Sequence, residues 1–413
     1  MMKSKKPEEI YPVEEISASV QRISDLKEKF KKEFSSDEGL NVFSVAGRIE
    51  VGGNHTDHQL GKVLCATIHS DTLAVAKVRD DKVVRILSEG YPLITVDLSE
   101  IQMVKEEENT TAALVRGVAY KLKEQNFDIG GFDAVVTSNV LKGSGMSSSA
   151  SFEGLLGIVF NEFFCQNQVK LMELAKIGQY AENVYFGKPS GLMDQIACIL
   201  GGFIYIDFYD KENPKIEKID PTFLANVYDV CIIDTGDAHS DLTQEYTDIT
   251  LEMQEISQFF GEDYLSRVKE DDFYEKLPVV KEKFGDRAIL RAIHFFQDNR
   301  MVEEECKALR EEDLEKFLQL VKASGRSSVA NLQNIYAISQ PQVQGASIIL
   351  ALCQKLLGDF GAYRIHGGGF GGTVQAFVPK GKTAHFKTEI EKVMGKDSCH
   401  VVAIRCASGA KVI

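Results

Sequence analysis

The N-terminal part of the chain carries two hydrophobic patterns. Apolar residues from 16 to 34 recur at the period of an amphipathic helix. Short apolar runs bounded by glycines or polar turns follow, and this pattern is typical of strands. The predicted strands are 41–46, which ends at Gly47, and 63–68, 73–78, 83–87 and 132–140. Before the last of them, Thr110 or Thr111 begins a predicted helix, because a threonine hydroxyl can cap the first backbone amides.

The pattern changes in the second half of the chain. Gly201-Gly202 and the apolar run 203–208 predict a strand at a domain boundary. Residues 248–317 are acidic with helical periodicity, and a helix is expected to start at Pro341. The other predicted elements are helices ending near 165 and over 171–180 and 386–393, and strands over 363–366, 373–378 and 401–405. Because strands and helices alternate irregularly, the pattern favours an α+β fold over a doubly wound parallel sheet.

The length of 413 residues predicts about two domains, since a domain holds roughly 100–200 residues. We expect an N-terminal α+β domain over residues 1–205 and a C-terminal α+β domain over residues 206–413.

Charge and composition narrow the possible partners. The 47 basic and 61 acidic side chains give a formal charge of −14, which repels nucleic-acid phosphates and anionic membranes. A small anionic ligand in a locally positive pocket stays compatible with this charge. No segment approaches the ~20 apolar residues of a membrane span, and no signal-peptide core follows the charged first residues. The eight cysteines form no CxxC pair and lie mostly in apolar runs, which predicts free thiols and a cytoplasmic protein.

A glycine–serine loop over residues 143–150 lies between a predicted strand and a predicted helix. Glycines let a ligand approach the backbone, and the first amides of a helix favour negative charge. Serine hydroxyls can bind phosphate or Mg²⁺. The candidate phosphate-binding residues are Gly143, Ser144, Gly145, Ser147, Ser148 and Ser149. This is not a Walker A loop, since no Gly-Lys-Ser/Thr follows, and a serine-rich helix cap is the alternative.

A second segment combines Arg48 with Asn54, His55, Asp57 and His58 in a glycine-rich stretch. Donors and acceptors in this number suit a polyol such as a sugar. A metal site built from the two histidines and the aspartate is the competing hypothesis, and a solvated loop is the third.

Two further segments stand out. Five glycines surround Phe370 in residues 367–372, more than a tight turn with a bulge requires, so the backbone can wrap closely around a ligand or loop. Asp194 lies among apolar neighbours in the segment 189–196. A helix N-cap is the commoner role for such an aspartate, and a carboxylate placed in a cleft is the other.

In combination these segments resemble the galactokinase branch of the GHMP small-molecule kinases. The resemblance runs from about residue 43 to 376 and includes all three family motifs in order. We call 47–58 motif one, 143–150 motif two and 364–372 motif three. Ala181-Glu182, the segment 191–195 and Glu245-Tyr246 also match this branch.

Motif one departs from the galactokinase pattern at four positions. Glu50 replaces an asparagine, Gly52 an isoleucine, Asn54 an acidic residue and His58 a tyrosine. In galactokinases that acidic residue helps to hold the sugar near its C6 end. We therefore expect Asn54 to bear on which sugar is bound.

The resemblance implies an active site in a cleft between two α+β domains. ATP would lie on motif two, with Mg²⁺ held by Ser148 or Ser149 and by Glu182. Asp194 would accept the proton of the sugar C1 hydroxyl, while Arg48 would keep that carboxylate ionised and stabilise the γ-phosphate. The implied sugar-binding residues are Asn54, His55, Asp57, Gly191 and Tyr246. The glycines of motif three would close over the phosphates.

The implied activity is phosphorylation of galactose by ATP to galactose 1-phosphate. One alternative is a kinase for a related sugar such as galacturonate, arabinose or N-acetylgalactosamine, and another is a non-catalytic galactose and ATP sensor on the same fold. The intact motif two, Arg48 and Asp194 favour an enzyme. Since no Arg or Lys stands beside Asn54, galactose is favoured over galacturonate. We expect a monomer or a weak homo-oligomer.

Overall fold

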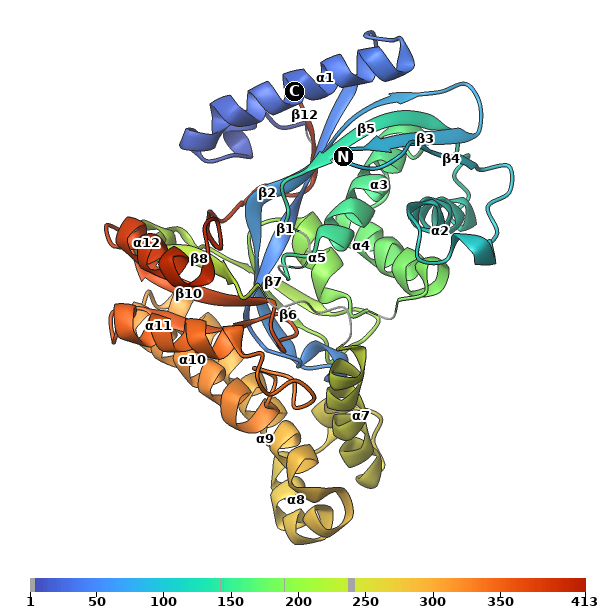
Figure 1. Cartoon of the computed structure of the whole chain (residues 1–413). Coiled ribbons are helices and arrows are strands. Elements are labelled where there is room, and N and C mark those ends of the chain that lie inside the picture. The colour runs from blue at the N-terminus through green and yellow to red at the C-terminus, as the bar shows by residue number, and fades with distance from the viewer. Residues whose placement is uncertain (1–3, 142, 144, 189, 237–241) are drawn as a thin grey trace.

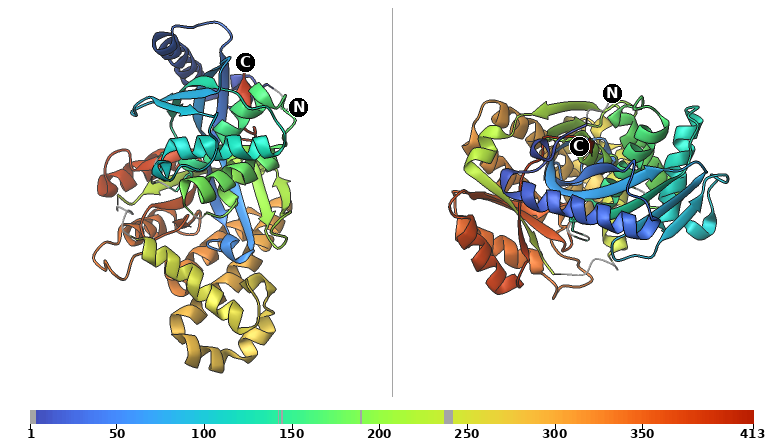
Figure 2. Two further views of the ribbon diagram at one scale, coloured as in Figure 1. Left: turned by 90° about the vertical axis from the view of Figure 1, so that its right-hand side faces the viewer. Right: turned by 90° about the horizontal axis from the view of Figure 1, so that it is seen from above.

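The computed structural model describes residues 4–141, 143, 145–188, 190–236 and 242–413, which form two sheets with their covering helices (Figure 1). The molecule is elongated, with the first long helix at one end and a helical arm at the other (Figure 2). The α+β prediction is confirmed. In the described part of the chain, no helix is both long and apolar enough to cross a membrane.

The larger sheet has eight strands, and its main path runs β12-β1-β2-β5-β3-β4, with β6 and β7 paired beside β2. All neighbours are antiparallel except β3 and β5. The strands are β1 (Asn41–Gly52), β2 (Lys62–Val78), β3 (Val83–Ser88), β4 (Ile94–Asp97), β5 (Phe132–Ser138), β6 (Phe203–Asp207), β7 (Lys215–Ile219) and β12 (Ala410–Val412). Because β7 and β12 belong to this sheet, the expected division at residue 205 does not separate the two sheets.

The first two strands are longer than the sequence predicted. The expected break at Gly47 is wrong, since β1 runs on to Gly52, and the two strands expected over 63–78 are the single strand β2. These strands pair with each other from Asn41 opposite Ala76 to Gly52 opposite Leu64. A register shift between Ala46 and Arg48 accommodates Gly47 as a bulge, so this glycine bends the strand without ending it.

Helices cover both faces of the larger sheet. Alternate strand residues point to opposite faces. Val42 and Val75 pack with Phe30 on one side, and their neighbours Phe43 and Ala74 pack with the other helices on the opposite side. The helix on the first side is α1 (Ile16–Phe34), and those on the second are α2 (Thr111–Glu124), α3 (Ser148–Phe164), α4 (Leu171–Tyr180) and α5 (Met193–Leu200). Between α4 and α5 the chain forms a π-helix, Ala181–Phe186.

The smaller sheet has four antiparallel strands in the order β11-β8-β10-β9. Its strands are β8 (Tyr228–Asp234), β9 (Ala362–His366), β10 (Thr373–Pro379) and β11 (Cys399–Val402), and its helices include α6 (Thr222–Val227), α10 (Leu314–Ser327), α11 (Gly345–Leu357) and α12 (Thr383–Met394). The helix expected at Pro341 begins four residues later, at Gly345. One apolar cluster contains Ile49 and Leu64 of the larger sheet and Ile232 and Phe377 of the smaller one, and so joins the two.

A helical arm extends from this core. It consists of α7 (Thr243–Phe259), α8 (Glu270–Glu275) and α9 (Leu277–Arg310), which confirms the helical prediction for this region (Figure 1). The path of α9 is interrupted at Gly285, whose φ of 79° is not helical. The C-terminal part of α9 returns to the larger sheet and carries buried polar residues that face motif one, including His294, Asp298 and Glu305.

Candidate active site

An arginine–aspartate pair lies where β1, α3 and α5 meet. Arg48 follows the bulge in β1, and Asp194 lies in the first turn of α5. The Arg48 Nε and Nη2 atoms lie 2.9 and 2.7 Å from the Asp194 Oδ1 atom. The arginine side chain is only 7% exposed, whereas that of Asp194 is 33% exposed. The buried Arg48 guanidinium thus holds the Asp194 carboxylate in place, while that carboxylate remains accessible to solvent.

The second oxygen of Asp194 accepts a hydrogen bond from Ser147. The Ser147 hydroxyl lies 2.5 Å from Asp194 Oδ2. Ser147 is the residue before α3 and has a left-handed backbone with φ of 58°, which turns its side chain toward α5. From the sequence, Ser147 was predicted only to bind phosphate. Its contact with Asp194 could not be predicted from a local pattern, because 47 residues separate the two.

Motif two surrounds the N-terminus of α3. Gly143 and Gly145 have left-handed φ values of 74° and 70°, which favour glycine. The carbonyl of Gly145 accepts a hydrogen bond from Arg48. Ser148 and Ser149 form the first turn of α3, where backbone amides have no partner within the helix. Ser144 lies outside the described residues.

Glu182, the predicted metal ligand, is a buried carboxylate in the π-helix. It is 3% exposed, and π-helical turns are frequent at functional sites. Its Oε1 atom pairs with Lys188 at 2.9 Å, and its Oε2 atom accepts hydrogen bonds from Ser190 at 2.5 Å and Gln195 at 3.0 Å.

A second carboxyl group lies behind Glu182. The Gln195 amide that contacts Glu182 also donates to Glu153 Oε2 at 2.9 Å. Burial and the Glu182 charge raise the pKa of Glu153 to about 8. Glu153 is therefore a neutral acid at pH 7, and Gln195 links the α3 helix to the predicted metal ligand.

Asp57 and Gly191 lie against each other beside the Arg48–Asp194 pair. A Cβ atom on Gly191 would lie 2.4 Å from the Asp57 Oδ2 atom, so only glycine leaves room for this carboxylate. Burial and the nearby Asp194 charge raise the pKa of Asp57 to about 6. These two predicted sugar-binding residues are thus brought together next to the predicted base.

His55 and Tyr246 contact the glycines of motif three. The His55 Nε2 atom lies 2.8 Å from the Gly368 carbonyl oxygen, and the Tyr246 hydroxyl donates to the Gly369 carbonyl at 2.9 Å. Burial lowers the pKa of His55 to about 4, so its imidazole is neutral. The Tyr246 ring also packs edge-on against Phe370, with 5.3 Å between the ring centres. In this structure the backbone of motif three therefore holds two of the predicted sugar-binding residues, His55 and Tyr246, through hydrogen bonds.

Asn54 does not occupy the position that the sequence predicted. It is 0% exposed, and its amide Nδ2 donates to Glu50 Oε1 at 3.0 Å and to the Gly367 carbonyl at 2.6 Å. Its Oδ1 atom accepts hydrogen bonds from Ser328 at 3.2 Å and Asn334 at 2.8 Å. With its amide saturated by protein groups, the side chain of Asn54 is not available to the C6 end of a sugar.

The backbone of Asn54 is also fixed by α9. Its N–H donates to Asp298 Oδ2 at 2.6 Å, and its carbonyl accepts a hydrogen bond from His294 at 2.9 Å. Next to it, Glu50 forms a buried ion pair with Arg364 of β9 at 2.7 Å. Burial and the Asp298 charge raise the pKa of Glu305 well above its usual value. This buried polar network has no local signal in the sequence, because its members come from four distant segments.

The competing metal hypothesis for the histidines gains no support. In the residues with described positions, no group of three or more His, Cys, Asp and Glu side chains could hold a metal ion. Mg²⁺ bound with a nucleotide needs fewer protein ligands, because it keeps waters and takes phosphate oxygens. A single buried carboxylate, Glu182, which Gln195 links to Glu153 of α3, fits that donor set.

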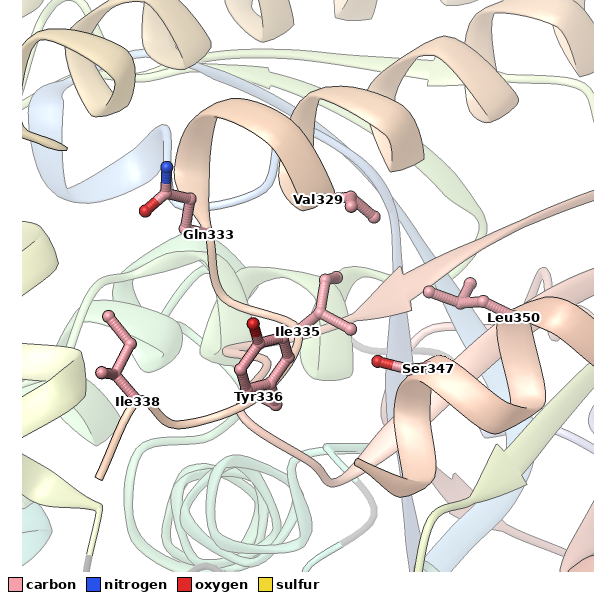
Figure 3. A pocket seen from close by; sticks show the side chains of 7 residues that line it. All are labelled: Val329, Gln333, Ile335, Tyr336, Ile338, Ser347 and Leu350. Atoms are coloured by element: carbon pink, nitrogen blue, oxygen red, sulfur yellow. The ribbon is translucent and has the colours of Figure 1, made fainter. Parts of the chain in front are cut away.

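A cavity with a volume of about 540 Å³ lies next to the segment that holds Ser328 and Asn334, and Arg48, Asp194 and Glu182 do not line it (Figure 3). It is lined by Val329, Gln333, Ile335, Tyr336, Ile338, Ser347 and Leu350. The described side chains that line it carry no full charge. A triphosphate is therefore better accommodated at motif two, where helix amides are available.

Fold and site together define a GHMP kinase. The family model of the GHMP kinases N terminal domain matches residues 113–202, which contain motif two, Glu182 and Asp194. The model of the galactokinase galactose-binding signature matches residues 28–78, which contain motif one. A mevalonate kinase structure has the same fold, with a TM-score of 0.59 at 16% identity over 89% of this chain and 99% of that one.

Relatives of this chain narrow the class further. A galactokinase of Lactobacillus helveticus is 31% identical over 377 residues, which cover 89% of this chain and 94% of that protein. A galactokinase of Lactococcus lactis subsp. lactis is 30% identical over 92% of this chain and 94% of that protein. The structure of Lactococcus lactis galactokinase complexed with galactose matches with a TM-score of 0.79 at 25% identity, over 94% of this chain and 99% of that one. The chain belongs to the galactokinase family.

Proposed function

We propose that this protein transfers the γ-phosphoryl group of ATP to the C1 hydroxyl of galactose, forming galactose 1-phosphate and ADP. The observation that carries the proposal is the partly exposed Asp194 carboxylate, held by Arg48 and Ser147 at the N-terminus of α3. Membership of the galactokinase family supports it, as does the similarity to a galactokinase structure that contains galactose.

Asp194 accepts the proton of the attacking hydroxyl in this proposal. Arg48 stabilises the ionised carboxylate and reaches toward motif two, where charge develops on the transferred phosphoryl group. Positioning is the other main contribution of the protein to phosphoryl transfer. The residues proposed to hold the sugar are His55, Asp57, Gly191 and Tyr246. Asn54 acts on the sugar only indirectly, by fixing the loop that carries His55 and Asp57.

Motif two is the proposed nucleotide site. The left-handed glycines 143 and 145 leave the backbone open, and the first amides of α3 have no partner within the helix and can bind an anion. Ser148 or Ser149 and Glu182 would hold Mg²⁺, which neutralises part of the phosphate charge when bound.

A coupled ADP-release assay over a panel of sugars, with and without Mg²⁺, tests the proposal. We expect the highest kcat/KM with galactose and no turnover without Mg²⁺. A higher kcat/KM with galacturonate, arabinose or N-acetylgalactosamine would identify that sugar as the substrate in place of galactose. Binding of galactose and ATP without ADP release would identify a sensor.

A further inference from the structure

Lys188 covers the carboxylate that is proposed to hold Mg²⁺. It follows the π-helix by two residues, and its Nζ atom lies 2.9 Å from Glu182 Oε1. The two side chains differ sharply in exposure, at 58% for Lys188 and 4% for Glu182. An exposed ammonium group on a long, flexible stem thus sits on a buried, fixed carboxylate.

The surroundings explain which partner is fixed. The other oxygen of Glu182 is held by Ser190 and Gln195, and Gln195 is itself held by Glu153. The Lys188 side chain is long, flexible and 58% exposed, so the ammonium is the group that can leave. Lys188 also lies in the field of Asp194 and Glu153.

A divalent cation at Glu182 would repel this ammonium group. The same cation would arrive with a nucleotide whose phosphate oxygens carry excess negative charge. A lysine released from Glu182 then finds strong acceptors within the reach of its side chain, and ammonium–phosphate hydrogen bonds are among the stronger polar contacts in proteins.

We propose that Lys188 is a phosphate-binding residue that Glu182 holds in place until the Mg²⁺-nucleotide enters. Lys188 neutralises Glu182 in the nucleotide-free protein. When Mg²⁺ binds the Glu182 carboxylate, the Lys188 side chain moves and its ammonium group binds the phosphate oxygens instead. This rests on the proposed function, because it needs a nucleotide at motif two. The opposite role is a lysine that only blocks the metal site, and that role predicts the opposite change in affinity.

Isothermal titration of ADP, with and without Mg²⁺, separates the two roles without any turnover. We expect Lys188→Met to weaken Mg²⁺-ADP binding by about five- to thirtyfold, the range of one partly exposed charged contact, and Lys188→Arg to stay within about threefold of wild type. Lys392→Met is the matched control, since it removes the same charge from an exposed pair on α12. Galactose binding without nucleotide should be unchanged in all variants.

Each outcome has a distinct meaning. Unchanged or tighter Mg²⁺-ADP binding by Lys188→Met would overturn the inference and leave the proposed function intact. Equal weakening by Lys392→Met would also overturn it, because the effect would then come from net charge alone. Failure of the wild-type protein to bind ADP would overturn the proposed function and this inference with it.

Discussion

Motif one is a single short segment whose two ends behave differently. At the reaction end, Arg48 pairs with a carboxylate that is 33% exposed. At the anchored end, Asn54 is fully buried and every hydrogen-bonding atom of its amide is occupied by protein groups. Polar residues of similar appearance in the sequence thus serve reactivity at one end and rigidity at the other.

This difference predicts two kinds of mutational effect. Substitution of Asp194 at the reaction end should reduce turnover and leave stability almost unchanged, because its carboxylate is partly solvated. Substitutions at the anchored end should reduce stability, because an unpaired polar or charged group remains in a buried site.

The largest effect is expected for Asp194→Asn. The amide keeps the shape and can still accept hydrogen bonds from Arg48, but it cannot take up a proton, so kcat should fall about 10²–10⁴-fold. The melting temperature should stay within a few degrees of wild type. Steady-state kinetics and thermal unfolding measure both, and Asp359→Asn, at a fully exposed side chain, should change neither. A kcat within threefold of wild type would remove Asp194 as the base.

Asn54→Glu should mainly destabilise the protein. The new carboxylate would face Glu50 and the Gly367 carbonyl, two acceptors that now receive hydrogen bonds from the Asn54 amide. We expect a loss of about 2–5 kcal/mol in the free energy of unfolding, measured by denaturant titration. Asn213→Glu makes the same change at an exposed loop position and should cost less than about 0.5 kcal/mol.

A double variant sharpens the same test. Glu50→Asn combined with Asn54→Glu exchanges the carboxylate and the carboxamide and restores the usual galactokinase arrangement of these two positions. Since the two side chains are in contact, their effects should not add, and the pair should recover part of the stability lost by Asn54→Glu. Strictly additive losses would show that the contact between the two residues is not what the single change disrupts.

Ser148→Ala and Ser149→Ala should give smaller, nucleotide-specific effects. Replacement of the serine that holds Mg²⁺ should raise the KM for ATP about tenfold. It should also raise the Mg²⁺ concentration needed for the half-maximal rate. The galactose dissociation constant serves as the internal control and should not change. If both serines only cap α3, stability would fall by about 1 kcal/mol and the Mg²⁺ dependence would stay as in wild type.

The smallest effect is a pH dependence of sugar binding. Asp57 has a pKa of about 6, raised by burial and by Asp194, so it is ionised above that pH and protonated below it. If galactose is bound by the ionised form, its dissociation constant should rise by up to about tenfold between pH 7.5 and pH 5. Titration calorimetry at both pH values measures this. Asp57→Asn should bind more weakly at pH 7.5 but lose the pH dependence.

The sequence could predict the features that depend on local pattern. The helix over 16–34, the helical arm and the glycine–serine loop before α3 each have a signal within one stretch of chain, and the structure contains all three. The resemblance also paired Arg48 with Asp194, although 146 residues separate them, because both belong to family motifs.

The features that the sequence did not predict depend on distant partners. Gly47 reads equally well as a strand end or a bulge, and only its pairing with β2 decides between them. The local sequence predicts Asn54 as an exposed sugar-binding residue. Its burial depends on Asp298, Ser328 and Asn334, which lie 244 to 280 residues away. Local periodicity contains no information about such contacts.

The attachment of motif one to α9 also has a consequence for the order of folding. Asp298 accepts a hydrogen bond from the N–H of Asn54. The next residue of α9, Asn299, accepts one from the N–H of Lys62 at 2.7 Å. Two adjacent helix residues thus bind the two ends of the loop between Asn54 and Lys62. These contacts close loops of more than 230 residues, and contacts of such separation form late. During synthesis, the loop with His55 and Asp57 emerges early but lacks its anchor until α9 has been made and packed. Sugar recognition is thus among the last properties that the folding chain acquires.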